Sequence, residues 1–219
     1  MKVIPVSAPS RVEHLLRRAP DGPVPVVHRG PHAVYVEVGG WCVGIVDGDA
    51  ARVPCALRAA GSGVPDTETA HLAGGVLHVD GVPLVVGRFV EVRVPRLVSA
   101  GAPVARADQG PEVAALVGAG DGLTPYGDDV LCGWLALHRA KRVETPDVDA
   151  EVRRLLPRTT LLSATLLDCA IRGEVLPEFA AYVAALGTAW EAAATEALAA
   201  VGGSSGAGLL EGARWALAA

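Results

Sequence analysis

The sequence predicts an α+β fold, with a small antiparallel β-sheet or barrel in residues 1–97 and an all-helical part in residues 111–219. In the first part, apolar residues alternate with polar ones in short runs between turn signals. In the second part, apolar residues recur at helical spacing. The small and polar residues 98–110 between them are typical of a linker. This order favours two packed subdomains over a doubly wound sheet.

About five to seven short strands are expected in the first part. Tight turns at Gly39-Gly40 and Asp80-Gly81 join two pairs of them into hairpins. Residues 48–73, which Pro54 interrupts, fit no single element. The strand pattern starts at Val24 and is clearest over residues 34–38, 41–46, 76–79, 82–86 and 90–94.

One helix is expected before these strands, over residues 10–19. Ser10 is its expected N-cap, with Glu13 as the capping-box partner, and Pro20 ends it. The other expected helices all lie in the second part, where Gly173 is typical of a helix C-cap. They cover residues 111–117, 128–141, 147–156, 160–172, 175–186, 188–201 and 205–218.

Composition excludes several classes of protein. The chain has 219 residues, of which 51% are hydrophobic, so a sizeable core is possible and global disorder is excluded. Its net charge of −5 argues against a nucleic-acid partner. The four cysteines are scattered without a Cys-x-x-Cys pair, which indicates buried free thiols. With no signal-peptide core and no apolar run of membrane-spanning length, we expect a cytoplasmic protein with no membrane partner.

Histidines are concentrated in the first part, but their spacing does not predict a metal site. Four of them, His28, His32, His71 and His78, lie among or between the expected strands. No two of them share an evident face of a strand at ligand spacing. We therefore expect no metal to be bound there.

The most unusual stretch is residues 118–134, in which five glycines and one proline surround several acidic residues and a threonine. Three glycines near its start permit positive φ and close approach of a ligand to the backbone. Pro125 keeps the loop open, and Asp128 or Asp129 is the expected N-cap of the next helix. Such a loop is suited to an anion, although two carboxylates would compete with it unless a cation lies between them. The alternative is a capped helix after a long loop.

Two further loops of similar character begin helices in the same part of the chain. One contains Thr159 and Thr160, either of which is suited to be an N-cap. The other contains Ser204 and Ser205, which are suited in the same way. Each loop alone is explained by capping. Antiparallel helices could, however, bring all three loops to a common end of the helical part.

These loops define a candidate site. Arg158 and Arg172 are its candidate cations. The candidate catalytic residues are Thr124, Asp128 and Asp129. The candidate substrate-binding residues are Gly120, Gly122, Arg158, Thr159, Thr160, Ser163 and Ser205.

The same motifs resemble a known bacterial family. The pattern runs Gly-x-Gly-Leu-Thr-Pro-x-Gly-Asp-Asp at residues 120–129, Thr-Thr-x-x-Ser at 159–163, Ala-x-x-Gly at 170–173 and Gly-Ser-Ser-Gly at 203–206. It is similar to the AllH-type subunit of oxamate carbamoyltransferase, an enzyme of anaerobic allantoin and purine breakdown. The resemblance covers residues 112–216. Members of that family commonly have histidine where Gly203 stands and aspartate where Gly208 stands.

The resemblance implies a role in moving a carbamoyl group between carbamoyl phosphate and oxamate, together with other subunits and with a small anionic substrate. The Ser-Thr-Arg-Thr phosphate signature of ordinary transcarbamoylases is absent from the sequence. Two other hypotheses stay open. In one, Asp128 and Asp129 hold Mg²⁺ in an enzyme that acts on a phosphate or a nucleotide. In the other, the chain is a non-catalytic structural subunit whose loops only cap helices.

Overall fold

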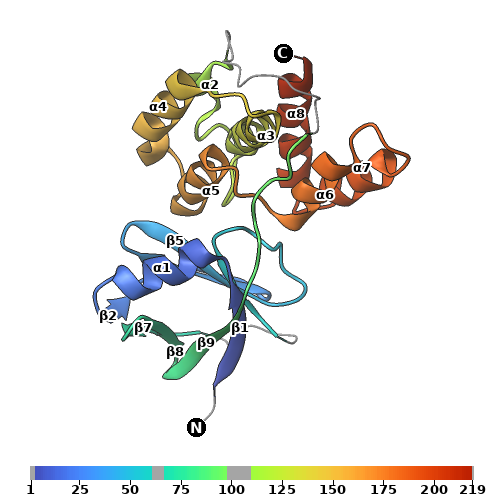
Figure 1. Ribbon diagram of the computed structural model, residues 1–219. Helices are drawn as coiled ribbons and strands as arrows, with labels where there is room; N and C mark the ends of the chain where they lie inside the picture. Colours follow the sequence, from blue (N-terminus) through green and yellow to red (C-terminus); the bar gives the residue numbers. More distant parts are fainter. Residues whose placement is uncertain (1–2, 61–66, 98–109, 219) are drawn as a thin grey trace. The chain divides into compact units, whose positions relative to one another are not determined.

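The computed structural model describes residues 3–60, 67–97 and 110–218. The expected linker at residues 98–110 therefore lies almost entirely outside the described residues. Contacts within the chain divide it into a sheet unit, Met1–Glu91, and a helical unit, Val92–Ala219. The mixed fold class predicted from the sequence, a sheet followed by helices, is confirmed (Figure 1).

The sheet unit is built on one nine-stranded sheet with the order β2-β7-β8-β9-β1-β6-β5-β4-β3. Most neighbouring strands are antiparallel, as predicted. Two pairs, β1 with β9 and β5 with β6, are parallel. The strands are β1 (Ile4–Ala8), β2 (Gly22–Val24), β3 (Val26–Arg29), β4 (Ala33–Val38), β5 (Trp41–Val46), β6 (Ala56–Ala59), β7 (Ala70–Ala73), β8 (Val76–Val79) and β9 (Val82–Phe89).

Both hairpin turns lie where the sequence predicted them. Gly39 and Gly40 have φ of 59° and 77°, and Asp80 and Gly81 have φ of 46° and 77°. Two successive residues with positive φ give the turn a twist that matches the flanking strands. Local turn chemistry therefore determined these two connections.

Three strands were missed by the sequence analysis. β1 has a proline as its second residue, and β6 and β7 fall in the region that fitted no single element. Conversely, the strand expected at residues 90–94 does not join the sheet. β9 ends at Phe89, and the later β-pairing of this segment is an isolated bridge between Arg93 and Glu174 within the helical unit. The alternating valines of this segment misled the prediction because Val92 and Val94 belong to the helical unit, where Val94 packs against the core.

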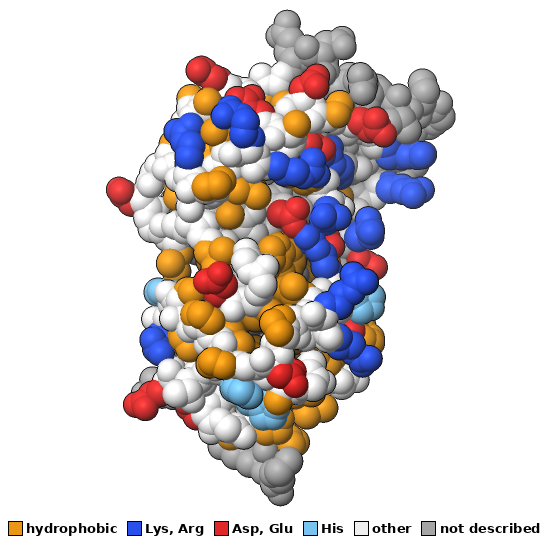
Figure 2. Space-filling model, turned by 90° about the vertical axis from the view of Figure 1, so that its left-hand side faces the viewer, with side chains coloured by type: hydrophobic (Ala, Val, Ile, Leu, Met, Phe, Trp, Pro, Cys, Tyr) orange, Lys and Arg blue, Asp and Glu red, His pale blue; other side chains and the backbone are white. Residues whose placement is uncertain are grey.

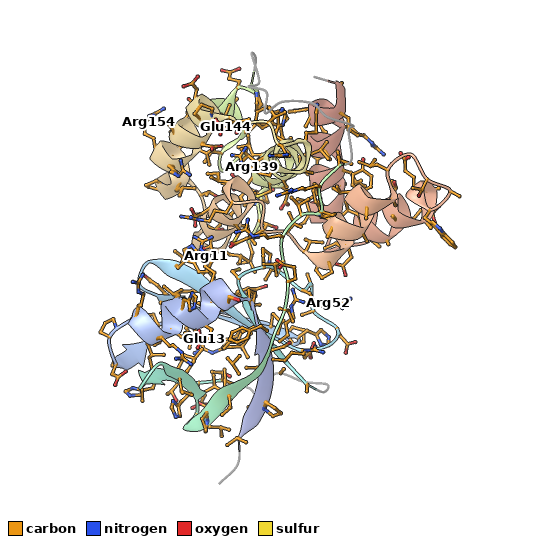
Figure 3. The ribbon with its side chains drawn as sticks, viewed as in Figure 1. Arg11, Glu13, Arg52, Arg139, Glu144 and Arg154 are labelled. Carbon is orange, nitrogen blue, oxygen red and sulfur yellow. The ribbon has the colours of Figure 1, made fainter. Side chains whose placement is uncertain are left out.

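Helix α1 (Ser10–Arg18) contributes Val12 and Leu16 to the core of the sheet unit. The predicted N-cap at Ser10 is wrong, since Pro9 occupies that position and no side chain caps the helix. Glu13 instead forms an ion pair with Arg17 one turn later. On the same helix, Arg11 lies over the ring of Trp41, 4.3 Å from its centroid (Figure 3).

The helical unit contains seven α-helices and one short 3₁₀ helix among its described residues, and their positions follow the sequence prediction closely. Val94 and Leu97 of the preceding segment also belong to this unit, because their N–H groups donate to Gly173 and Ala140. The helices are α2 (Val113–Leu116), α3 (Tyr126–Lys141), α4 (Pro146–Leu155), η1 (Leu156–Arg158), α5 (Leu161–Ile171), α6 (Pro177–Ala185), α7 (Glu191–Ala199) and α8 (Ser205–Ala218).

Helix α3 is the centre of the helical unit and is buried along most of its length. Arg139 near its end holds the surrounding helices together (Figure 3). Its guanidinium donates to the Ile171 carbonyl at 2.7 Å and to both carboxylate oxygens of Asp149 at 2.6 and 2.7 Å. The core around α3 contains apolar side chains from all seven α-helices of the unit, among them Leu131, Leu135 and Phe179, and Leu156 of η1 packs against it.

Helices α3 and α8 lie side by side, and glycines on both allow their backbones to touch (Figure 1). A Cβ on Gly212 would lie 1.8 Å from the Val130 carbonyl oxygen, and one on Gly133 would lie 2.0 Å from that of Leu209. No side chain fits at either distance. The close contact brings the start of α8 against the first turn of α3, where the candidate site residues lie.

The described helices are all too short or too polar to cross a membrane. Acidic and basic side chains are both exposed on the face of each unit that Figure 2 shows. All four cysteines are buried and free, as predicted.

The glycine contact between α3 and α8 leads to a prediction. Gly212→Ala should destabilise the protein by at least about 2 kcal/mol, because its methyl group overlaps the Val130 carbonyl and forces the helices apart. Gly203→Ala is the control, since a Cβ there meets no atom within 4 Å. Its effect should stay within about 0.5 kcal/mol. Urea unfolding followed by helical circular dichroism measures both. Equal stability of the two variants would contradict the proposed contact.

Candidate functional site

The loop before α3 takes a backbone conformation that requires glycine. Gly118, Gly120 and Gly122 have φ of 76°, 117° and 90°. A Cβ on Gly118 would lie 2.6 Å from the Arg158 carbonyl oxygen, and one on Gly120 would lie 2.8 Å from the Tyr126 nitrogen. The N–H groups of Gly120 and Gly122 form no hydrogen bond with the described part of the chain. They are therefore available to a ligand.

Helix α3 begins earlier than the sequence suggested. Its N-cap is Pro125, with φ −51° and ψ 141°, and no side chain caps it. The prediction that Asp128 or Asp129 is the N-cap is therefore wrong. Both aspartates lie inside the first helical turn, where their charges are favoured by the helix dipole. Their carboxylates are free to serve other partners.

Asp128 is fully buried and holds two of the three loops together. Its Oδ1 accepts the N–H of Gly118 at 2.9 Å. Its Oδ2 accepts the hydroxyl of Ser163 at 2.7 Å and also the hydroxyl of Thr159. Asp128 is thus a buried acceptor that fixes the loop before α3 against the start of α5.

Asp129 is 4% exposed and thus nearly as buried as Asp128, but it has fewer hydrogen-bond partners. Its Oδ2 has no hydrogen-bond partner within the described structure. Burial raises the pKa of Asp129 from 3.8 to about 7, and the nearby charge of Asp128 adds to the rise. Hydrogen bonds from Ser205 and Thr124 oppose it. The result is a carboxyl group that titrates near neutral pH.

The remaining predicted hydroxyls also meet at this end of the helices. The hydroxyls of Thr124 and Ser205 lie 2.9 Å apart and join the first loop to the third. Thr160 is the N-cap of α5, as predicted, and accepts the N–H of Ser163 at 3.1 Å. Its hydroxyl also donates to the Leu123 carbonyl at 2.5 Å. The structure therefore brings the three loops together, although their role in catalysis stays a prediction.

The two candidate cations are placed differently. Arg158 immediately precedes Thr159, and its exposed side chain forms no hydrogen bond or ion pair with the described residues. Arg172 is at the opposite end of α5, which places it about 18 Å from Thr160 at 1.5 Å per residue. It interacts with Asp168 at 3.7 Å. The assignment of Arg172 to this cluster is therefore wrong.

The sequence analysis missed three neighbours of Asp129. The hydroxyl of Tyr126 donates to Glu211 at 2.5 Å, and this hydrogen bond raises the pKa of Tyr126. Burial, with the charges of Asp129 and Asp128, raises the pKa of the Cys132 thiol well above its usual value. Cys132 therefore remains protonated and is a poor nucleophile. Tyr126 and Cys132, three residues before and after Asp129 on the same helix, could have been found from helical spacing, whereas Glu211 on α8 could not.

The cluster offers one titrating carboxyl, several hydroxyls and free backbone donors, but no evident metal site. Both carboxylate oxygens of Asp128 already accept hydrogen bonds from the protein, so neither is open to a metal ion. Among the described residues, three potential ligand atoms approach one another only at His32, Asp47 and Asp49 of the sheet unit. The sequence analysis compared histidines with each other and did not pair His32 with these aspartates.

Fold and site together define an α+β protein whose helical unit gathers three glycine- and hydroxyl-rich loops around a buried pair of carboxyl groups. Residues 116–217 match the family model described as oxamate carbamoyltransferase subunit AllH. This match confirms the resemblance that the motifs indicated, and it spans all three loops. No curated protein and no solved structure matches the chain.

The role of Asp128 predicts a large loss of stability on its removal. Asp128→Ala should cost on the order of 3 kcal/mol or more, because it leaves the Gly118 N–H and two hydroxyls without their acceptor. Asp121→Ala is the matched control from the same loop, because Asp121 is exposed. It should change stability by less than about 0.5 kcal/mol. Urea unfolding tests both, and similar losses would show that Asp128 is not a structural link.

The raised pKa of Asp129 predicts a dependence of stability on pH. The folded state binds this proton more tightly than the unfolded chain, since the pKa rises from 3.8 to about 7. The resulting stabilisation is full below pH 3.8 and is lost as the pH rises through about 7. Wild type should therefore lose stability relative to Asp129→Asn across this window. The free energy of unfolding of both proteins, measured at several pH values, tests this, and a constant difference would contradict it.

Proposed function

We propose that this chain is a subunit of an oxamate carbamoyltransferase that works in bacterial allantoin breakdown in the cytoplasm. The observation that carries the proposal is the family match over residues 116–217, because it covers the same three loops that the structure brings together. The proposed reaction transfers the carbamoyl group of carbamoyl phosphate to oxamate and gives oxalurate and phosphate. Other subunits would complete the enzyme.

Asp129 is the proposed general base. In the reaction, the amide nitrogen of oxamate attacks the carbamoyl carbon. A C–N bond forms, the C–O bond to phosphate breaks, and the nitrogen loses a proton. A base with a pKa near the working pH is the most effective acceptor of that proton, and burial raises the pKa of Asp129 to about 7. The Oδ2 atom of Asp129, which has no hydrogen-bond partner within the described structure, would accept this proton.

The other residues of the cluster fit binding roles. The free N–H groups of Gly120 and Gly122 would donate to the phosphate or to the developing oxyanion. Arg158 adds a positive charge beside Thr159 and Thr160. Thr124 and Ser205 would hold the Asp129 carboxyl in place, since both form hydrogen bonds to it. Asp128, Thr159 and Ser163 would position the loops rather than touch the substrate.

The hypothesis that Asp128 and Asp129 together hold Mg²⁺ is less well supported. Asp128 already accepts three hydrogen bonds from the protein, and a cation would have to displace donors that fix the fold. Only Asp129 would remain as a carboxylate ligand, which is the minimum of the one or two carboxylates that usually hold Mg²⁺ together with substrate phosphates. A requirement for Mg²⁺ would therefore have to come from the substrate and a single carboxylate.

The decisive experiment is an assay of oxalurate formation. The chain alone should be inactive or nearly so, and mixing it with the other subunits of the complex should give turnover. In that complex, Asp129→Asn should lower kcat by about 10²–10⁴-fold, because it removes the base but keeps the shape of the side chain. Asp121→Asn, a control from the same exposed loop, should change kcat by less than about twofold.

The pH dependence separates catalysis from structure. In the active complex, kcat/KM should fall as the pH drops below about 7, because Asp129 becomes protonated. Full activity of the Asp129→Asn complex would remove Asp129 from the mechanism. It would leave the chain as a structural subunit.

A further inference from the structure

Three neighbouring strands of the sheet unit align two arginines with a serine. Ser7 of β1 is paired with Arg58 of β6 on one side and with Arg88 of β9 on the other. Residues directly opposite each other on paired strands point to the same face of a sheet, with Cβ atoms about 5 Å apart. Arg58, Ser7 and Arg88 therefore form a row across the sheet, with the serine between the two arginines, and all three line one cavity.

An irregularity in the sheet creates this row. Val6 pairs with Val86, but the next residue, Ser7, pairs with Arg88, so Gly87 is an extra residue in β9. Without this bulge, Ser7 would face Gly87 and the side chain of Arg88 would point to the other face. Bulges often redirect a side chain next to a functional site. Here the bulge adds a second cation to the face that carries Arg58.

The loop after β5 places a third arginine over the same face. This arginine is Arg52, which lines the same cavity as Arg58 and Arg88. Figure 3 shows it at some distance from Arg11 and Glu13 of α1. Its carbonyl accepts a hydrogen bond from Arg58 Nη2 at 3.0 Å, which ties the loop to β6. Asp47 at the start of the loop is buried and accepts the N–H groups of Asp49 and Ala50 at 2.9 and 3.2 Å. It also lies 3.1 Å from His32 Nδ1.

These residues enclose a cavity of about 510 Å³, which is within the range of small-molecule sites. Its charged lining consists of the three arginines and Asp47, so about two positive charges are left over. Gly48, Gly87, Ala59 and Ala60 complete the wall and leave room near the backbone. Such a cavity favours a compact anion with two negative charges.

We propose that this cavity binds a phosphate dianion, either as inorganic phosphate or as the phosphoryl group of a small metabolite. Arginine guanidinium groups form paired hydrogen bonds with phosphate oxygens, and three of them match a group with several equivalent oxygens. Ser7 adds a hydroxyl donor between Arg58 and Arg88. The site is in the sheet unit, which the family match does not cover, so the proposal is independent of the carbamoyl-transfer chemistry.

Titration of the full chain with inorganic phosphate at constant ionic strength, followed by amide NMR, tests the proposal. Phosphate should shift the amide signals of Ser7, Gly87 and Arg88. Arg88→Gln should weaken this binding at least about tenfold, which corresponds to 1.4 kcal/mol. Arg88 is exposed, so the variant should stay folded. Ser7→Ala should weaken it less. Arg18→Gln, which removes an exposed arginine from α1, is the control and should bind like wild type.

Several outcomes would overturn the proposal. They are the absence of shifts at Ser7 and Gly87, an equal loss of affinity in Arg88→Gln and Arg18→Gln, and tighter binding of oxalate than of phosphate. Asp129→Asn should leave these shifts unchanged, which separates this site from the proposed active site. A parallel titration with methyl phosphate distinguishes inorganic phosphate from the phosphoryl group of a metabolite. If methyl phosphate binds as well as inorganic phosphate, the site accepts a phosphoryl group on a metabolite, and if it fails to bind, the site takes the free ion.

Discussion

The helical unit depends on one buried charge. The carboxylate of Asp128 has no contact with water, so it is stable only because three protein donors replace water around it. Those donors come from two loops that are about 40 residues apart in the sequence. The need to satisfy Asp128 therefore fixes the glycine-rich loop against the start of α5. Without this requirement, each loop would be an ordinary helix cap.

The same arrangement explains why Asp129 is different. Two adjacent carboxyl groups enter the same buried region, and most of the donors go to the first. Asp129 bears the cost of burial and also the repulsion of Asp128, with only two hydroxyls to oppose them. A buried carboxyl group whose pKa is raised toward neutrality is typical of acid–base sites. The close packing of α3 on α8 through Gly212 and Gly133 keeps the start of α8 beside this group.

The sequence predicted what local chemistry decides. Helix positions followed from apolar periodicity, Thr160 followed from its capping chemistry, and the turn at Asp80 followed from its dipeptide. β1 could not be predicted, because it is a strand only through pairing with segments more than 50 residues away. The aspartates were misplaced because capping preference suggested a local partner, whereas their partners are distant hydroxyls. Likewise, only the register of β1 shows that Arg58 and Arg88 share a face.

Gly208 links the packing of the helices to the chemistry of the site. A Cβ at this position would lie 2.8 Å from the Cβ of Asp129, so α8 can approach this closely only where residue 208 is glycine. A larger side chain at this position, such as that of aspartate, would overlap Asp129 and force α8 away. Glycine at position 208 therefore leaves room for the Asp129 side chain, whose burial raises its pKa to about 7.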